Sequence, residues 1–130
     1  MDIETLRGIP LFAELDDDGL DVIARLATEF EAQAGRVLAE IGQPGSGLFV
    51  IEDGTVEVDM PDGAVVELGP GEFFGEVALL TDSPRNARVR ALTDVRCLAI
   101  SRHVFMLLLD AQPRIAATML PIVARRLSGH

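Results

Sequence analysis

The chain has 130 residues, 48% of them hydrophobic and 25% charged, which is the size and balance of one globular domain with a small core. Its formal net charge of −10 argues against a nucleic-acid surface, and one cysteine with two histidines leaves too few ligands for a typical structural zinc or iron–sulfur site. No apolar run of 18 residues is present and the N-terminus is acidic, so we expect no membrane span and no signal peptide. The lone Cys97 suits a reducing compartment, and a cytoplasmic location is expected.

The first part of the chain predicts helices. Apolar residues from Ile3 to Leu6 indicate a short helix, followed by a turn at Pro10. The acidic run 16–18 precedes apolar residues at helical spacing, and acids favour the start of a helix. We therefore predict a helix over 17–29 and helical structure across about 3–29.

Residues 36–100 change to short apolar or alternating segments separated by Gly/Pro turns, such as 61–63 and 69–71. This pattern predicts an antiparallel β-roll of the jelly-roll type. The glycine-rich loop 42–47 lacks the Lys-Ser/Thr that a phosphate-binding P-loop requires, so it is interpreted as a turn between strands. Cys97 lies in an apolar strand and is expected to be a buried, inert thiol.

The C-terminal part predicts helices again. Ser101 can cap a helix over 102–110, and Pro113 suits the first turn of a helix over 114–128. We expect Pro121 to interrupt and kink that last helix. The expected fold is therefore α+β, a single domain over 1–130 with helices on both sides of a β-roll.

The stretch 71–91 carries the chemistry. A short helix beginning near Glu76 would direct free backbone N–H groups at an anion, and Arg85 can add a bidentate guanidinium. The Glu76 carboxylate accepts hydrogen bonds from a hydroxyl or amine. An anion site beside a hydroxyl site fits a sugar phosphate. From the residues alone, Glu76 as a capping or solvated carboxylate and Arg85 as half of an internal ion pair remain alternatives.

The same stretch resembles the phosphate-binding cassette of the cyclic nucleotide-binding domain, found in catabolite activators, kinase regulatory subunits and cyclic-nucleotide-gated channels. The resemblance covers nearly the whole chain, from Pro10-Leu11-Phe12 through Leu48–Ile51. It is strongest at Phe74-Gly75-Glu76-Val77-Ala78-Leu79-Leu80, followed by Pro84-Arg85 and Ala87.

The resemblance implies a cyclic nucleotide sensor, with cAMP as the expected ligand and cGMP left open, that moves its C-terminal helices on binding. It implies no cofactor, metal or catalytic residue. In the family the glutamate holds the ribose 2′-hydroxyl, a role that falls on Glu76. The arginine and backbone amides hold the cyclic phosphate, a role that falls on Arg85, Gly75, Val77, Ala78, Asn86 and Ala87. Val58 and Val65 match positions that touch the base, and Arg125 is the first choice, ahead of Arg126, for a lid over it.

Departures from the family pattern leave alternatives. Asn86 stands where the family often has Ala, Ser or Thr, which leaves the choice between cAMP and cGMP open. Arg88 stands where a smaller or apolar residue is common. Arg88 could fill the pocket of an interaction module that has lost its ligand. A cupin-type metal enzyme is less favoured, because His103 and His130 both lie outside the strand region. No helix-turn-helix, kinase or channel segment is present, so we expect a stand-alone sensor or an isolated domain.

Overall fold

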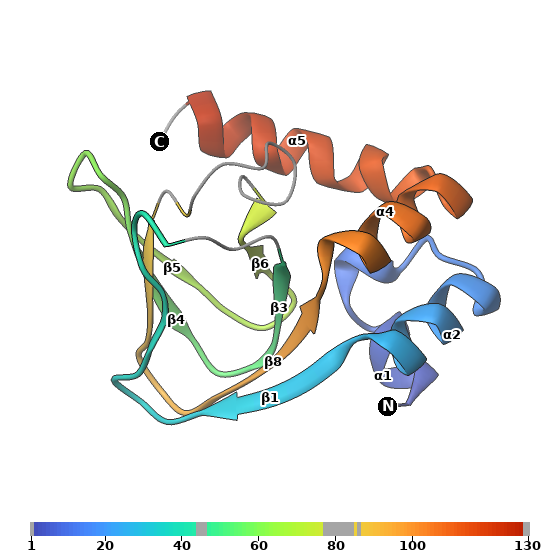
Figure 1. Cartoon of the computed structure of the whole chain (residues 1–130), viewed down its shortest axis with the longest axis horizontal. Helices are drawn as coiled ribbons and strands as arrows, with labels where there is room; N and C mark the ends of the chain where they lie inside the picture. The colour runs from blue at the N-terminus through green and yellow to red at the C-terminus, as the bar shows by residue number, and fades with distance from the viewer. Residues whose placement is uncertain (1, 44–46, 77–84, 86, 129–130) are drawn as a thin grey trace.

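The chain folds as the expected α+β β-roll, with helices at one end and a long helix across its open side (Figure 1). The computed structural model describes residues 2–43, 47–76, 85 and 87–128, with side chains up to residue 126. In chain order the elements are α1 (Ile3–Arg7), the 3-10 helix η1 (Pro10–Phe12), α2 (Asp17–Leu26), β1 (Thr28–Ala32), β2 (Val37–Ala39), β3 (Leu48–Asp53), β4 (Val56–Asp59), β5 (Val65–Leu68), β6 (Phe73–Phe74), β7 (Arg88–Ala91), β8 (Val95–Ile100), α4 (Arg102–Ala111) and α5 (Arg114–Ser128).

In the described part of the chain the strands form two four-stranded antiparallel sheets, ordered β1-β8-β3-β6 and β2-β7-β4-β5. The predicted turn at 61–63 closes the β4–β5 hairpin, in which Val58 pairs with Val66. Gly63 adopts φ 90°, and the Asp62 side chain accepts a hydrogen bond from the Ala64 amide. A left-handed glycine and an Asx turn are local devices, so this hairpin follows directly from its sequence.

Two apolar cores lie on opposite sides of the sheet that contains β3 and β8. Successive side chains on a strand point to opposite faces. Val50 and Leu98 therefore join the core beneath the helices, whereas Ile51 and Cys97 join the core inside the roll. Cys97 is fully buried, and burial raises the pKa of its thiol to about 11, as expected for an inert cysteine.

The predicted helix over 17–29 is wrong at its C-terminal end. Asp16 caps α2 through a 2.9 Å hydrogen bond from the Gly19 amide, but the helix ends at Leu26. Residues 28–32 instead pair with β8 along their whole length, so the β-roll begins at Thr28 rather than at residue 36. Pairing with a distant strand decides the conformation of this segment, which helical spacing alone cannot reveal.

The C-terminal helices lie where they are predicted. Ser101 caps α4 by accepting a 3.2 Å hydrogen bond from the Val104 amide. The expected interruption at Pro121 is wrong, because α5 runs through this residue as one helix. Pro121 is exposed, while Met119 and Val123 on either side of it are buried against the domain and hold the helix across the missing N–H.

Among the described residues no single helix is both long and apolar enough to cross a membrane. The helices α4 and α5 meet that criterion only as a pair bent by 120°.

Candidate functional site

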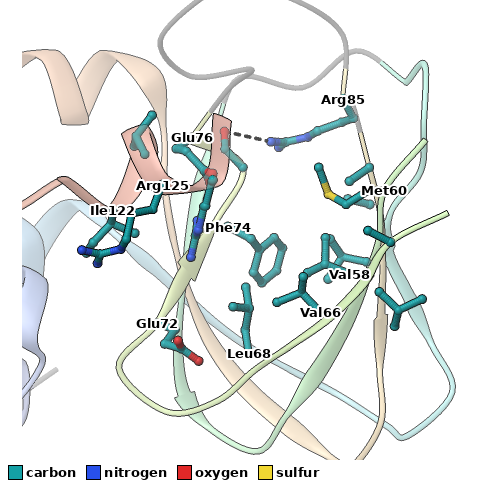
Figure 2. A pocket seen from close by; sticks show the side chains of 18 residues that line it. Val58, Met60, Val66, Leu68, Glu72, Phe74, Glu76, Arg85, Ile122 and Arg125 are labelled. Carbon is teal, nitrogen blue, oxygen red and sulfur yellow. Dashed lines mark hydrogen bonds and ion pairs between the residues drawn. The ribbon is translucent and has the colours of Figure 1, made fainter. Parts of the chain in front are cut away.

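A cavity of about 700 Å³ lies between the sheet β2-β7-β4-β5 and the last turns of α5 (Figure 2). Figure 2 shows Glu76 and Arg85 at one end of this cavity, with Val58, Val66 and Leu68 along its middle. Its apolar lining residues are Ala39, Val58, Met60, Ala64, Val65, Val66, Leu68, Phe74, Ala87, Val89, Ile122 and Val123. The cavity therefore offers one charged end and one long apolar wall.

The charge of this cavity is opposite in sign to that of the whole chain. Its described charged lining residues are two glutamates and three arginines, Glu72, Glu76, Arg85, Arg125 and Arg126, whereas the whole chain has a net charge of −10. Glu72 also accepts a 2.7 Å hydrogen bond from the Gly69 amide and so holds the turn before β6. A concave site with excess positive charge favours an anionic ligand.

Arg85 is held in place by neutral backbone groups. Its Nη1 donates to the carbonyl oxygens of Gly47 at 3.1 Å and Gly75 at 3.4 Å, and its guanidinium lies 5.3 Å from the Phe49 ring centroid. Its backbone pairs with the loop at Gly42 and Gln43, so that glycine-rich turn positions the arginine.

The charge of Arg85 stays available for a ligand. In the segments that the structure describes, no carboxylate forms an ion pair with it, while Asp82 lies outside the described residues. Burial lowers the pKa of Arg85 from its ordinary value, and the nearby Glu76 charge opposes that change. A guanidinium stays protonated in any case. Arg85 is therefore a preorganised, half-buried cation without a described anionic partner.

Gly75 lets Arg85 approach the chain closely. Its φ is 93°, and a Cβ atom there would lie 2.6 Å from the Arg85 Nη1 and 2.7 Å from the Gly47 carbonyl oxygen. Only glycine combines that backbone angle with that lack of space. The Gly75-Glu76 pair is thus explained residue by residue: the first makes room for the cation, and the second supplies the carboxylate beside it.

Glu76 is a buried carboxylate paired with a cation from the last helix. It is only 6% exposed, and its Oε1 lies 2.9 Å from the Nη1 of Arg126. The Arg126 guanidinium also lies 4.6 Å from the Phe73 ring centroid. A solvated role for Glu76 is therefore wrong, whereas a capping role would involve residues 77–84, which lie outside the described residues. Its carboxylate lines the cavity, where it can accept a hydrogen bond from a ligand.

The predicted site residues come together to the extent that the structure describes them. Gly75, Glu76, Arg85 and Ala87 line the charged end, and Val58 is a buried residue of the apolar wall. Two other predicted residues, Val65 and Arg125, also line the cavity but are exposed at its rim. Val77, Ala78 and Asn86 lie outside the described residues.

Several lining residues, Met60 and Val66 among them, were missing from the sequence prediction, and Arg126 was considered there only after Arg125. Met60 follows Val58 by two positions on the same strand face, and Val66 is the hairpin partner of Val58, so the strand period could have identified both. Arg126 lies three residues after Val123 and four after Ile122, which places it on the same face of α5. Arg125 lies three residues after Ile122 and also lines the cavity, so helical spacing alone does not choose between the two arginines; the packing of α5 places Arg126 at Glu76.

The two alternative functions lose their structural support in the described residues. Arg88 is exposed and its Nε lies 3.1 Å from Glu40 Oε2, so it does not fill the pocket as the ligand-free interaction module requires. In the ranges that the structure describes, no three or more His, Cys, Asp or Glu side chains form a group able to hold a metal. A cupin-type metal site therefore has no ligand set there.

Comparisons with known proteins agree with this geometry. Residues 29–112 match the cyclic nucleotide-binding domain family. A cyclic nucleotide-gated potassium channel of Mesorhizobium japonicum is 39% identical over 113 residues, which make up 87% of this chain and 31% of the channel. The chain therefore spans less than a third of the length of that relative.

Solved structures of other proteins are similar to this chain in both sequence and fold. The N-terminal domain of a transcriptional regulator from Streptomyces coelicolor is 36% identical, with a TM-score of 0.70 over 98% of this chain and 91% of that one. The Thermus thermophilus catabolite activator protein is 29% identical, with a TM-score of 0.78 over 91% of this chain and 58% of that one.

Proposed function

Since this chain belongs to the cyclic nucleotide-binding domain family, we propose that it is a non-catalytic sensor of cAMP that couples binding to movement of its C-terminal helices. The observation that carries the proposal is that Arg85 and Glu76 both line the charged end of a cavity whose other walls are apolar. Arg85 would hold the cyclic phosphate and Glu76 the ribose hydroxyl. The proposal includes a cytoplasmic location, which the unpaired Cys97 thiol suits.

The apolar wall supports adenine as the base. Beyond the charged end, the lining side chains Val58, Met60, Val66 and Leu68 offer no strong hydrogen-bonding group. Adenine and guanine each carry one exocyclic amino group, but guanine adds a C6 carbonyl oxygen and an N1–H donor, and an unpaired polar group is costly to bury. This wall therefore accommodates adenine at a lower desolvation cost than guanine.

Isothermal titration with cAMP and cGMP tests the proposal directly. We expect both to bind, with cAMP tighter by roughly tenfold, the cost of about 1.4 kcal/mol for an incompletely paired carbonyl or N–H group of guanine. No heat with either nucleotide at millimolar concentration would reject the function itself. Equal affinities would reject only the preference for adenine.

Movement of α5 is expected to appear as slower amide exchange. The helix carries Ile122 and Val123 against the cavity, and a ligand that binds this closed arrangement better will shift the population toward it. We predict that saturating cAMP slows exchange across about 115–128 by more than global stabilisation explains. The strands β1 and β8, which contribute no residue to the cavity lining, serve as the internal reference. Unchanged protection in α5 at saturation would mean that this helix is not the moving part.

Glu76 is expected to distinguish ribose from deoxyribose. A hydrogen bond to a buried charged acceptor is worth about 1.5–3 kcal/mol, so 2′-deoxy-cAMP should bind the native protein roughly 10- to 150-fold more weakly than cAMP. In Glu76→Ala the two ligands should differ by less than about threefold, because the acceptor is gone. Glu67→Ala, an exposed residue of β5, is the control and should keep the native ratio. Equal binding of both ligands to the native protein would contradict the hydroxyl role.

A further inference from the structure

The last turns of α5 present two adjacent arginines in different surroundings. Arg125 is exposed at the rim of the cavity. The Arg126 side chain is only 26% exposed, pairs with Glu76 Oε1 at 2.9 Å and lies over the Phe73 ring. Arg126 is thus bound to the same carboxylate that faces the ligand cavity.

Glu76 needs this cation for an electrostatic reason. Its side chain is 8% exposed, and a carboxylate removed from water is strongly destabilising unless a cation compensates it. Arg85 is the other cation at this end of the cavity, but backbone carbonyls hold it instead. With Arg126 neutralising Glu76, Arg85 has no ion-pair partner among the described residues and can meet an anionic ligand.

The geometry also allows the ion pair and a ligand to coexist. Arg126 Nη1 lies 2.9 Å from Glu76 Oε1, and an ionised carboxylate can accept several hydrogen bonds across its two oxygens. A ligand hydroxyl can therefore bind Glu76 while Arg126 stays in place. In that arrangement Glu76 links the ligand on one side to α5 on the other.

We propose that Arg126 is a positioning residue: it holds the Glu76 carboxylate for the ligand hydroxyl and makes the closed position of α5 part of binding. This inference rests on the proposed function and names the Arg126–Glu76 ion pair as the contact through which the ligand acts on α5. In this proposal the Glu76 carboxylate, which binds the ligand hydroxyl, couples the ligand to α5 through Arg126. The Arg126 side chain need not touch the base.

The test compares Arg126→Gln with Arg114→Gln in the full chain, since Arg114 lies on the same helix, is exposed and does not line the cavity. We expect Arg126→Gln to weaken cAMP binding by about 5- to 150-fold, the usual range of a coupling between two sites, and Arg114→Gln by less than threefold. The preference for cAMP over 2′-deoxy-cAMP should fall in Arg126→Gln alone, because Glu76 is no longer oriented. A purely structural role would weaken both ligands equally. Arg126→Lys, which keeps the charge, should recover part of the lost affinity.

A second measurement tests the Arg126–Glu76 ion pair in the absence of ligand. In the empty protein, Arg126→Gln and Glu76→Gln should each speed amide exchange across residues 122–128, and the double variant should speed it no further than either one. Native or tighter cAMP binding by Arg126→Gln would overturn the proposal, since Arg126 would then be neutral or compete with the ligand. If the native protein binds no cyclic nucleotide, the proposed function fails and this inference with it. If instead the native protein binds and exchange is unaffected, only the inference fails.

Discussion

Arg85→Leu is expected to weaken cAMP binding by about 2–5 kcal/mol, or roughly 30- to 5,000-fold, the cost of removing one partner from a desolvated charge pair. Arg85 is the half-buried cation at the charged end of the cavity, held by the carbonyls of Gly47 and Gly75. Leucine fills similar space but leaves a bound phosphate without its counter-charge. Isothermal titration measures the loss.

The stability of the protein should change little in the same variant. The described interactions that the variant gives up are two backbone hydrogen bonds and the contact of the guanidinium with the Phe49 ring, so the free energy of unfolding in urea should stay within about 2 kcal/mol of the native value. Arg88→Leu is the matched control, because Arg88 is exposed and forms a surface ion pair with Glu40. Its affinity should remain native. An Arg85→Leu affinity within about threefold of native would show that the phosphate site is wrongly assigned.

Glu52→Gln is expected to stabilise the protein at pH 8 by up to about 3 kcal/mol. The Glu52 side chain on β3 is 5% exposed, with Arg96 Nε at 3.5 Å. Burial raises the pKa of Glu52 to about 7, and the neighbouring Glu29 carboxyl adds to that rise while Arg96 opposes it. Above pH 7 the folded protein must hold a buried carboxylate, whereas a neutral glutamine carries no such cost.

The stabilisation by Glu52→Gln should depend on pH in a definite direction. Because the folded pKa of Glu52 lies above the ordinary value of 4.5, the folded state holds a proton that the unfolded state releases between these two values. Native stability should therefore fall as the pH rises from about 5 to 8, and the advantage of Glu52→Gln should vanish near pH 5. Urea unfolding at four pH values measures this slope. Glu67→Gln, at an exposed position of β5, should keep the native slope, and an identical slope in Glu52→Gln would contradict the prediction.

The sequence by itself determined the features whose causes are local. The Asp16 and Ser101 caps and the turn at 61–63 depend on neighbouring backbone groups, and each was predictable from a few adjacent residues. The cassette that contains Glu76 and Arg85 likewise identified the family, because its residues follow one another closely in the chain.

Only the tertiary structure decided the features that join distant segments. Residues 28–32 became a strand because β8, about 70 residues later, pairs with them along the whole segment. The helix α5 passes through Pro121 because buried contacts on both sides hold it. Arg126, and not the first-choice Arg125, meets Glu76 because the rotation of α5 is set by packing against the roll. Contacts between residues fifty or more positions apart depend on how the elements pack, and no local pattern in either segment encodes them.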